Sequence, residues 1–555
     1  MQVAVRFSGN WFLLLPLLLF FVRPVSAETP PFTENGDELG LTDTRSGQER
    51  AIGQAWGDYD NDGWLDLYVT DTDGPNTLFR NLNGERFERV ADDTVALPDA
   101  YSGGAIFADY NNDGWQDLYV LNWGENVLFR NEQGTFVDVT AEAGVAGGDK
   151  NSQTASWGDY DRDGLLDMYV ANWACYGRCG RPTQGDIDRL YHNNGDGTFT
   201  DVTRQLGTKT VGAGFVASFV DFDNDGDLDI YLVNDEFINP IGNILWRNDG
   251  AGCDGWCFTE ISKESGTNAY LMGMGLASAD FDRDGFVDFH FSNAGPTQLL
   301  RNQGDGTFSN VAADVGVEFA DGISWGTVFL DYDNDGWQDL YVAIMGGKDG
   351  THPGNPLFRN TGDGMFELVE ASGARDFGRS LGVASADYNQ DGAVDLLVGN
   401  IDDGYHLFTN NGNDNDWLEL RLVGDGVNIN RDAVGSRVFV ELDDGAILMQ
   451  DVTAGGSLGA GHSLILHFGL GHSQVKRLEI VWPDGTRWQT NRAPQNAMHT
   501  VTYGLENESA LEPYVPPTLF GMPLGAVVGS VIALLLLVAI SLPMVNGYRN
   551  YQEEQ

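Results

Sequence analysis

A nine-residue acidic segment occurs seven times along the chain, and strand-like sequence flanks every copy. The copies begin at Asp58, Asp109, Asp159, Asp221, Asp280, Asp331 and Asp387. Positions 1, 5 and 9 are always Asp and position 6 is always Gly, while position 3 is Asp in five copies and Asn in two, Asn111 and Asn389. Carboxylates this close repel one another unless a cation lies among them. The pattern therefore predicts a repeated cation-binding loop.

Oxygen is the expected donor atom in every copy, because the ligand positions hold neither His nor Cys, and this indicates a hard cation. A flexible loop rich in Asp and Asn suits Ca²⁺ better than the smaller Mg²⁺, and the Gly permits the sharp turn. We expect up to seven Ca²⁺ ions, each bound by the side chains at positions 1, 3, 5 and 9 and the main-chain carbonyl at position 7. The expected ligands are Asp58, Asp60, Asp62, Trp64 and Asp66; Asp109, Asn111, Asp113, Trp115 and Asp117; Asp159, Asp161, Asp163, Leu165 and Asp167; Asp221, Asp223, Asp225, Asp227 and Asp229; Asp280, Asp282, Asp284, Phe286 and Asp288; Asp331, Asp333, Asp335, Trp337 and Asp339; and Asp387, Asn389, Asp391, Ala393 and Asp395.

An EF-hand loop begins in the same way, but it needs a bidentate Glu at position 12 and a helix after the loop. Position 12 is apolar in every copy: Val69, Val120, Val170, Leu232, Phe291, Val342 and Val398. Short β-branched and aromatic runs follow position 9, so each loop is expected to join two strands. The two loops with Asn at position 3 have one negative charge fewer, so they are expected to bind Ca²⁺ more weakly than the others.

The copies are spaced by 51, 50, 62, 59, 51 and 56 residues, and periods near 50 with several strands per unit indicate a propeller. A second signature, such as Leu78-Phe79-Arg80-Asn81, follows each loop, and a Gly turn and a further strand come next. Four strands per unit predict an all-β, seven-bladed β-propeller over residues 28–413. The seventh unit lacks its outer strand, and residues 31–41 resemble that missing piece, so we expect them to close the ring and cover a sheet edge.

The repeats resemble the FG-GAP/VCBS repeats of integrin-α-like propellers. The segment after them resembles the ASPIC/UnbV domain of the cartilage acidic protein family, through the runs 430–438, 455–457, 467–471 and 478–485. The resemblance implies a small β-sandwich-like domain over 414–503 and an acidic, Ca²⁺-binding, adhesion-like protein.

The two ends of the chain carry export and membrane signals. Arg6, an apolar stretch over 11–22 and the small residues before Glu28 predict a signal peptide over 1–27. A Pro-containing linker (504–518) precedes an uncharged segment, 519–545, which is long enough for a transmembrane helix and leaves a short cytoplasmic tail, 546–555. A sorting tail that is later removed is the alternative. The expected location is periplasmic or at the cell surface, with the ectodomain outside the cytoplasm.

The net charge limits the partners that the chain can bind, and the cysteine content predicts its disulfides. The net charge of −51 argues against nucleic acid as a partner. Four cysteines form two close pairs, Cys175 with Cys179 and Cys253 with Cys257, which in an exported protein predicts two local disulfides. Cross-pairing and a Cys₄ zinc site remain open.

No catalytic constellation is evident. Residues 455–459 match a G-x-S-x-G string, but their flanks lack the strand-turn-helix context of a nucleophile. Trp123, Trp173 and Tyr176 fall in connections at the end opposite the loops and are candidates for a ligand-binding rim, unless they pack between blades. The sequence favours a membrane-tethered adhesion or ligand-binding module for a protein or glycan; a polysaccharide-acting propeller enzyme and a scaffold subunit of an envelope complex are the alternatives.

Overall fold

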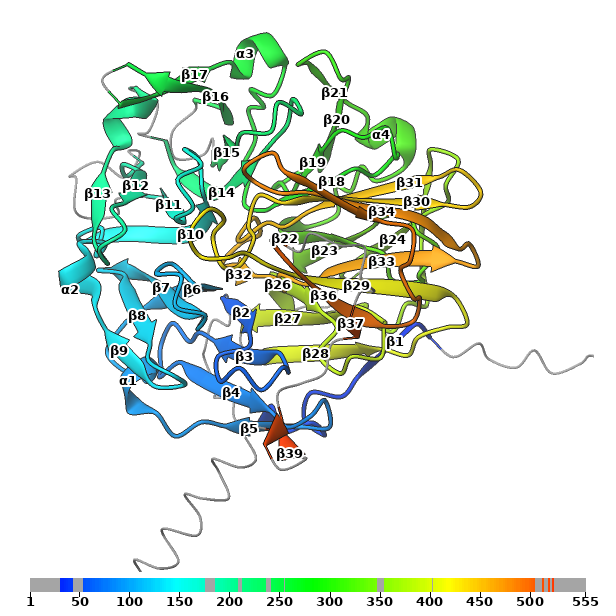
Figure 1. The fold of residues 1–555 in the computed structure, drawn as a ribbon, viewed down its shortest axis with the longest axis horizontal. Coiled ribbons are helices and arrows are strands. Elements are labelled where there is room, and N and C mark those ends of the chain that lie inside the picture. The colour runs from blue at the N-terminus through cyan, green and yellow to red at the C-terminus, as the bar shows by residue number, and fades with distance from the viewer. Residues whose placement is uncertain are drawn as a thin grey trace, which may run out of the picture.

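The computed structural model describes residues 30–42, 53–174, 185–207, 212–235, 241–253, 255–346, 354–401 and 403–504, and three two-residue strands beyond them. Nearly all regular structure is β, with a few single-turn helices. Figure 1 shows the strands of the repeats arranged around a common centre, with the C-terminal strands in front of them. The expected signal peptide, Cys175, Cys179, Tyr176 and nearly all of the expected membrane segment lie outside the described residues.

The repeats fold into antiparallel four-stranded units in chain order. The first three are β2 (Gln54–Gly57), β3 (Asp66–Val69), β4 (Thr77–Asn81) and β5 (Phe87–Arg89); β6 (Ser102–Ala108), β7 (Asp117–Gly124), β8 (Val127–Asn131) and β9 (Phe136–Asp138); and β10 (Lys150–Gly158), β11 (Asp167–Asn172), β12 (Arg189–Asn193) and β13 (Phe199–Asp201). The next three are β14 (Gly214–Val220), β15 (Asp229–Asn234), β16 (Ile244–Gly252) and β17 (Gly255–Glu260); β18 (Leu276–Ala279), β19 (Asp288–Phe291), β20 (Gln298–Asn302) and β21 (Phe308–Asn310); and β22 (Ile323–Leu330), β23 (Asp339–Met345), β24 (Leu357–Asn360) and β25 (Phe366–Leu368). Single-turn helices follow some outer strands: α1 (Asp93–Ala96), α2 (Thr140–Ala143), η2 (Thr203–Leu206), α3 (Ser262–Ser265) and α4 (Ala312–Val315).

The last unit is built from both ends of the repeat region. β26 (Arg379–Ala386), β27 (Asp395–Ile401) and β28 (Gly404–Asn410) come from the seventh repeat, and β1 (Phe32–Glu34) supplies the outer strand. β1 pairs antiparallel with β28 through Phe32 opposite Asn410 and Glu34 opposite Phe408. The pairing is the one expected for the closing segment 31–41, and it covers the edge that β28 would otherwise expose.

Burial follows the position of a strand within its unit. The second strands are buried along their length, as in β3 and β15, because sheets of neighbouring units cover both faces. The outer strands bury one Phe and expose the next two residues, as in β5 and β9. Aromatic side chains fill the spaces between units; Tyr59 stacks on Phe136 with ring centroids 5.9 Å apart.

The C-terminal domain consists of two sheets that share one core. The first sheet contains β33 (Leu466–Gly471), β29 (Asp416–Val423), β36 (Met498–Thr502) and β37 (Glu512–Pro513), and the second contains β31 (Ile447–Asp451), β30 (Arg437–Leu442), β34 (Val475–Val481) and β35 (Arg487–Thr490). Leu420, Val440 and Ile480 lie in that core and are fully buried. The same hydrophobic cluster includes Trp157 of the third unit, so the domain packs directly on the propeller.

A Gly-rich segment of this domain, residues 453–463, enters the centre of the ring and is called the plug below. Within it β32 (Ala460–Gly461) pairs parallel with β2, and Ala454 forms a bridge with Trp157. The Gly459 carbonyl accepts from the N–H groups of Gln54 and Ala105. The plug thus replaces solvent at the inner strands of several units.

Beyond residue 504 only three short strands are described. β38 (Thr518–Leu519) pairs with β39 (Met522–Pro523), so Leu519 and Met522 of the expected membrane segment are in short strands here. Within the described residues, no helix has the length and apolar character needed to span a membrane.

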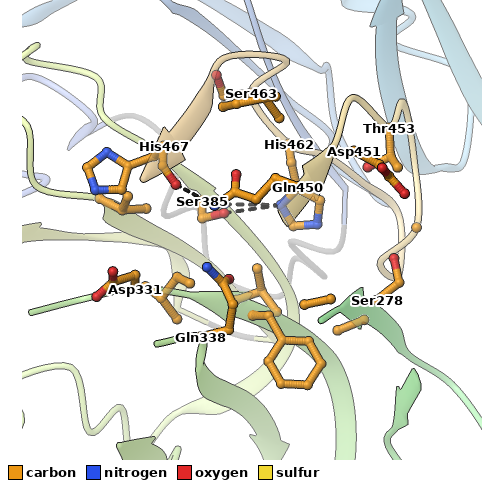
Figure 2. Close-up of a pocket in the computed structure, with 18 of the residues that line it drawn as sticks. Ser278, Asp331, Gln338, Ser385, Gln450, Asp451, Thr453, His462, Ser463 and His467 are labelled. Atoms are coloured by element: carbon orange, nitrogen blue, oxygen red, sulfur yellow. Dashed lines mark hydrogen bonds between the residues drawn. The ribbon is translucent and has the colours of Figure 1, made fainter. Parts of the chain in front are cut away.

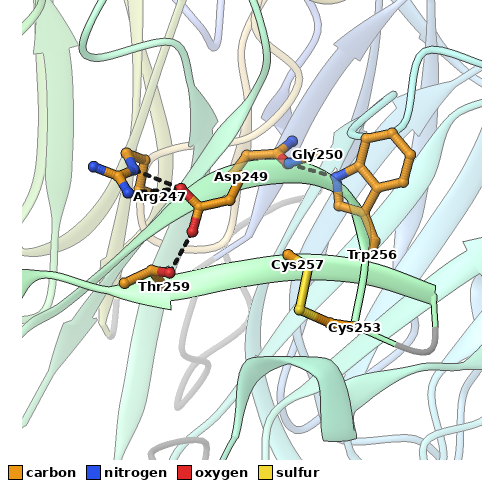
Figure 3. Close-up of a disulfide and its surroundings, with 8 residues drawn as sticks. Arg247, Asp249, Gly250, Cys253, Trp256, Cys257 and Thr259 are labelled. Atoms are coloured by element: carbon orange, nitrogen blue, oxygen red, sulfur yellow. Dashed lines mark hydrogen bonds and ion pairs between the residues drawn. A yellow bond between two sulfur atoms is a disulfide. The ribbon is translucent and has the colours of Figure 1, made fainter.

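The second cysteine pair forms a local disulfide. Cys253 and Cys257 are bonded at the turn between β16 and β17 (Figure 3), as expected for two local bridges. The bond joins the ends of a short loop, so it fixes that hairpin end and little else.

Candidate metal centre

The seven acidic segments, called loops 1 to 7 in chain order, share one backbone conformation. Each joins the first and second strands of its unit. In every loop the residue at position 4 has a positive φ between 53° and 63°, and the Gly at position 6 has a φ between 83° and 92°. These two left-handed residues, one on each side of position 5, fold the chain back on itself. Gly adopts this conformation without strain at position 6. The carboxylates of positions 1, 3 and 5 are thereby turned inward.

Main-chain donors hold the carboxylates at positions 5 and 9 in every loop and the carboxylate at position 1 in six of them. The position 5 carboxylate accepts from the N–H of position 7 in all seven loops, as Asp62 does from Trp64 at 3.1 Å. In six loops the position 1 carboxylate accepts from the Gly N–H, as Asp58 does from Gly63. The position 9 carboxylate accepts from the N–H of position 2 with one oxygen. These bonds orient the acids before any ion arrives.

The Asn that ends the second signature connects the loops to one another. Its N–H donates to the other oxygen of the position 9 Asp of its own repeat. Its side-chain amide donates to the position 2 carbonyl of the preceding loop, as Asn131 does to Tyr59 at 2.8 Å. Asn81 makes this bond to Tyr388 and so joins the first repeat to the last. The sequence showed this Asn in the signature but gave no role for it.

Several loop carboxylate oxygens are buried and have no hydrogen-bond partner. They are Oδ1 of Asp58 and Asp221 at position 1, and Oδ1 of Asp161, Asp223, Asp282 and Asp333 at position 3. A buried acceptor without a donor is costly, and a carboxylate more so than a neutral group. In the sets Asp58, Asp60 and Asp62 and Asp159, Asp161 and Asp163, one carboxylate oxygen from each residue lies within 4.8 Å of the others. A cation among them would satisfy these oxygens, so the residues present fit a hard metal ion.

The acid pKa values reflect the same crowding. Burial, followed by the charge of Asp62, raises the pKa of Asp60 to about 7. Burial, followed by the charge of Asp167, raises the pKa of Asp159 to about 8. A bound cation acts in the opposite direction, because it favours the ionised carboxylate.

Arginines of the second signature supply positive charge at three loops. Arg80 lies 2.7 Å from Asp60 and 2.9 Å from Asp62, and Arg359 makes the same pair of contacts with Asp333 and Asp335. Arg301 contacts Asp282 and Asp284. The loops with Asn at position 3 differ: Arg130 pairs with Glu132 in the second repeat, and Thr409 replaces the Arg in the seventh. Arg247 turns to Asp249 instead of loop 4 (Figure 3).

A ring of side-chain hydrogen bonds runs through position 4 of the loops. In six of them this side chain donates to the Gly carbonyl of the next loop, at 2.7 to 3.2 Å. Gln390 of loop 7 donates to Gly63 of loop 1, so the series returns to its start. The loops therefore form one connected surface at one end of the molecule.

The C-terminal domain covers this surface. Arg421 contacts Asp58 at 3.2 Å, and Arg437 contacts Asp221 at 3.5 Å. Asp432 accepts from the N–H of Asp109, and His467 bonds to Asn334 through Nε2 at 2.7 Å. Nothing in the sequence marked these contacts, since they join residues far apart in the chain.

The candidate rim residues lie at the other end and differ in exposure. Trp123 was expected in a connection but lies in β7, where it pairs with Asn151 of β10. Trp123 is 41% exposed and stacks on Tyr101, with centroids 4.7 Å apart. Trp173 packs against Phe215, and its Nε1 donates to Asp235 at 2.9 Å. Both tryptophans have main-chain pairing to Asn151. Tyr176 lies outside the described residues, so the structure places two of the three.

The G-x-S-x-G string lies in the plug. Ser457 is fully buried and donates to the Thr327 carbonyl. His462 lies beside Ser385, and His467 beside Glu419 and Asn334, so the two histidines have separate surroundings. Figure 2 shows both entering a central cavity that Asp331 and Gln338 also line. A nucleophile–base pair involving Ser457 is absent among these contacts.

Comparison with known proteins identifies both regions. Residues 58–120, 109–170, 177–232, 280–342 and 331–398 match the family described as FG-GAP-like repeat, and residues 426–508 match the one described as ASPIC and UnbV. Cartilage acidic protein 1 of Xenopus tropicalis is 27% identical over 288 residues, which are 49% of this chain and 43% of that protein. The Homo sapiens protein is 26% identical over 288 residues, 49% and 42% of the two chains. The match thus spans less than half the length of these relatives.

Two solved structures are similar at lower identity. One, described as the recognition of non-reducing terminal N-acetylglucosamine by an Agrocybe aegerita lectin, has 19% identity and a TM-score of 0.38 over 64% of this chain and 87% of that one. The other, the WD40 β-propeller domain of Doa1, has 12% identity and a TM-score of 0.37 over 66% and 94%.

Proposed function

The chain belongs to the FG-GAP-like repeat family and carries an ASPIC and UnbV domain, and from this we propose that it is a Ca²⁺-binding, seven-bladed propeller that binds an extracellular or periplasmic ligand. The ions act as structural staples of the loop end. The proposal includes export by the segment 1–27 and attachment to a membrane by 519–545.

The observation that carries the calcium assignment is the set of buried carboxylate oxygens without donors at positions 1 and 3 of the loops. Native proteins leave few buried acceptors unpaired, and an unpaired ionised group is the costliest kind. Among the described residues, arginines of the second signature neutralise part of this charge in loops 1, 5 and 6, and arginines of the C-terminal domain contact loops 1 and 4. Oxygen donors on a tight Asp-rich turn match the preference of Ca²⁺.

We propose ligand binding rather than catalysis as the main role. The relatives are named cartilage acidic protein 1, and this chain, with a net charge of −51, is acidic too. A rigid ring with short, repeated loops offers a stable platform on which the opposite end can vary. Ser457, the residue of the nucleophile-like string, serves the docking of the plug.

The ligand surface that we propose is the end opposite the loops, since the C-terminal domain covers the loop end. Trp123, Tyr270 and Phe377 are exposed by 41, 59 and 61%. Trp123 lies at the end of β7, the second strand of its unit, and Tyr270 and Phe377 lie in connections between the fourth strand of one unit and the first strand of the next. Exposed aromatic rings beside polar groups suit a sugar or a peptide.

The calcium proposal is tested on the full chain in detergent. Elemental analysis should find several Ca²⁺ ions per chain, and excess chelator should lower Tm by more than about 10 °C, because each ion at 100-fold its Kd stabilises the native state by roughly 2.7 kcal/mol. A metal-free protein with an unchanged melting curve would overturn the proposal.

The ligand surface is tested by retention on immobilised glycans and matrix proteins. Trp123→Ala should weaken retention on whichever support holds the parent chain and should change Tm little. Ile447→Ala, a similarly exposed apolar residue of the C-terminal domain, is the control. Equal retention of both variants would place the ligand surface elsewhere.

A further inference from the structure

The C-terminal domain contacts some loops through basic side chains and others through acidic side chains. Loops 1 and 4, which carry Asp at position 3, are met by arginines, Arg421 at Asp58 and Arg437 at Asp221. Loops 2 and 7, which carry Asn at position 3, are met by acids, Asp432 at Asp109 and Glu419 at Asp387. The domain therefore places a carboxylate at each of the two loops that have one carboxylate fewer, and at loop 2 it also places Arg431.

Glu419 is the most deeply placed of these acids. It lies on β29, is 2% exposed, and lines the central cavity of about 180 Å³ together with Asp387 and His467. Its Oε2 has no hydrogen-bond partner. Asp387 is its neighbour and lines the same cavity. A carboxylate that faces a second carboxylate in a buried site needs a proton or a cation between them.

His467 does not supply that proton. Its Nε2 lies 2.7 Å from Oδ1 of Asn334, an amide oxygen that can only accept. The assignment of this amide is fixed from its other side, because Nδ2 of Asn334 donates to the Gly392 carbonyl. Nε2 therefore carries the proton, and a neutral ring presents a lone pair at Nδ1, which lies 3.3 Å from Glu419 Oε1.

Loop 7 also lacks the signature arginine that contacts loops 1, 5 and 6. Thr409 stands where Arg80 and Arg359 stand in their repeats, and its hydroxyl bonds to Tyr388 instead. Asn389 at position 3 bonds to Asp391, which leaves Asp387, Asp391 and Asp395 as the acids of the loop. Glu419 would restore the number of carboxylates to that of the all-Asp loops.

We propose that Glu419 is a cation ligand that completes loop 7, so that one Ca²⁺ is held jointly by the propeller and the C-terminal domain. The inference rests on the proposed Ca²⁺-binding function and adds to it a specific interdomain site. Glu419 replaces the carboxylate missing at position 3, and the ion fastens β29 to the seventh repeat. Ca²⁺ then controls docking of the domain as well as the stability of single loops.

The test compares the parent chain with Glu419→Gln, Asn389→Asp/Glu419→Gln and Glu441→Gln. Glu441 is a suitable control because it loses the same charge within the same domain but pairs with Lys476 and Arg477 at the surface. Bound Ca²⁺ is counted by elemental analysis after equilibrium dialysis at a free Ca²⁺ concentration that saturates the parent. Docking is followed by the rate of limited proteolysis between residues 411 and 416.

The proposal predicts one Ca²⁺ fewer per chain for Glu419→Gln and cleavage at least 10-fold faster than in the parent at the same free Ca²⁺. Asn389→Asp/Glu419→Gln should regain the ion, because the carboxylate returns on the loop side, while cleavage stays fast. Glu441→Gln should match the parent in both measurements.

A protonated Glu419 that donates to His467 Nδ1 or shares its proton with Asp387 gives a different result. Gln resembles a protonated Glu, so Glu419→Gln would then keep the parent Ca²⁺ count and cleavage rate, and the proposal would be wrong. A parent chain that binds no Ca²⁺ at all overturns the proposed function itself, which is a separate outcome from an unchanged count in the variant.

Discussion

The two ends of the propeller differ in how their connections are built. At the loop end, every repeat uses the same nine-residue turn, the same main-chain bonds to the carboxylates at positions 5 and 9, and the same Asn bond to the preceding repeat. At the opposite end, the connections differ in length; residues 70–76 join β3 to β4, whereas residues 173–188 join β11 to β12. The difference shows that one end carries the constraints of ring closure, which leaves the other free to vary.

Removal of Ca²⁺ is expected to affect the two ends unequally, and this is the largest effect we predict. Chelation should raise hydrogen-exchange rates about 100-fold at the loop amides such as Gly63 and Gly336, the factor that corresponds to a ligand at 100-fold its Kd. Exchange rates of amides in the connections between second and third strands, such as residues 70–76, should change by less than 10-fold. A uniform increase at both ends would contradict the view that the ions stabilise the loop end in particular.

Two buried asparagines of one repeat sharpen the same comparison. Asn131 at the loop end bonds to Asp117, Gln116 and Tyr59, while Asn126 at the opposite end bonds to Asn122 and Tyr119. Asn131→Ala should lower the free energy of unfolding by about 2.5 kcal/mol, because it leaves buried carbonyls without donors.

The measurement is chemical denaturation of both variants with and without Ca²⁺. The cost of Asn131→Ala should shrink after chelation, since the loop it supports has already loosened, whereas Asn126→Ala should cost about the same in both conditions. Equal dependence on Ca²⁺ for the two variants would mean that the ends are not energetically distinct.

The loops and the strand order were predictable because their signals are local and repeated. Asp, Gly and apolar residues at fixed spacing predict a loop between strands, and the likeness of 31–41 to an outer strand predicted its pairing with the last repeat, where β1 is found. The local Cys253–Cys257 disulfide follows from the same short-range reasoning. The family resemblance is confirmed by the matches to both regions.

The plug and the covered loop end were not predictable, because they depend on contacts between distant residues. Gly459 shows why: a Cβ there would lie 3.3 Å from Cα of Gly53 and 3.4 Å from Cα of Gly104, and no period or spacing in the sequence relates these three glycines. The expectation of weaker Ca²⁺ binding at Asn111 and Asn389 considered each loop alone and omitted Asp432 and Glu419. That expectation is still untested, and it now competes with the interdomain proposal.

Gly459 offers a test of whether the plug anchors the C-terminal domain to the loop end. A Cβ at Gly459 would lie 2.5 Å from the Gly103 carbonyl oxygen, whereas one at Gly471, with nearly the same φ, would meet nothing within 4 Å. Gly459→Ala should therefore lower the free energy of unfolding by about 2 kcal/mol more than Gly471→Ala, the cost of overpacking beyond that of a left-handed residue. Thermal melts of the two variants with Ca²⁺ present give the difference. Equal Tm values would show that the plug accommodates the extra methyl group without loss of stability.

The smallest effect that we predict lies at the opposite end and depends on pH instead of Ca²⁺. His406 Nδ1 lies 2.7 Å from Asp376 Oδ2, and its Nε2 lies 3.3 Å from Asp403. Burial opposes the charged form of each partner, but their hydrogen bond and mutual charge outweigh it: the pKa of His406 is raised and the pKa of Asp376 is lowered.

A raised histidine pKa stabilises the fold below its unfolded value, about 6.5, and this contribution is lost as pH rises through the folded value. A lowered aspartate pKa stabilises the fold above about 3.9 and is lost as pH falls. The pair should thus contribute most between about pH 4 and 6.5, and His406→Gln should cost about 1 kcal/mol there and less at pH 9. Urea unfolding of parent and variant in saturating Ca²⁺ measures this difference; a cost that stays constant from pH 5 to pH 9 would show that the pair is not ionised in the fold.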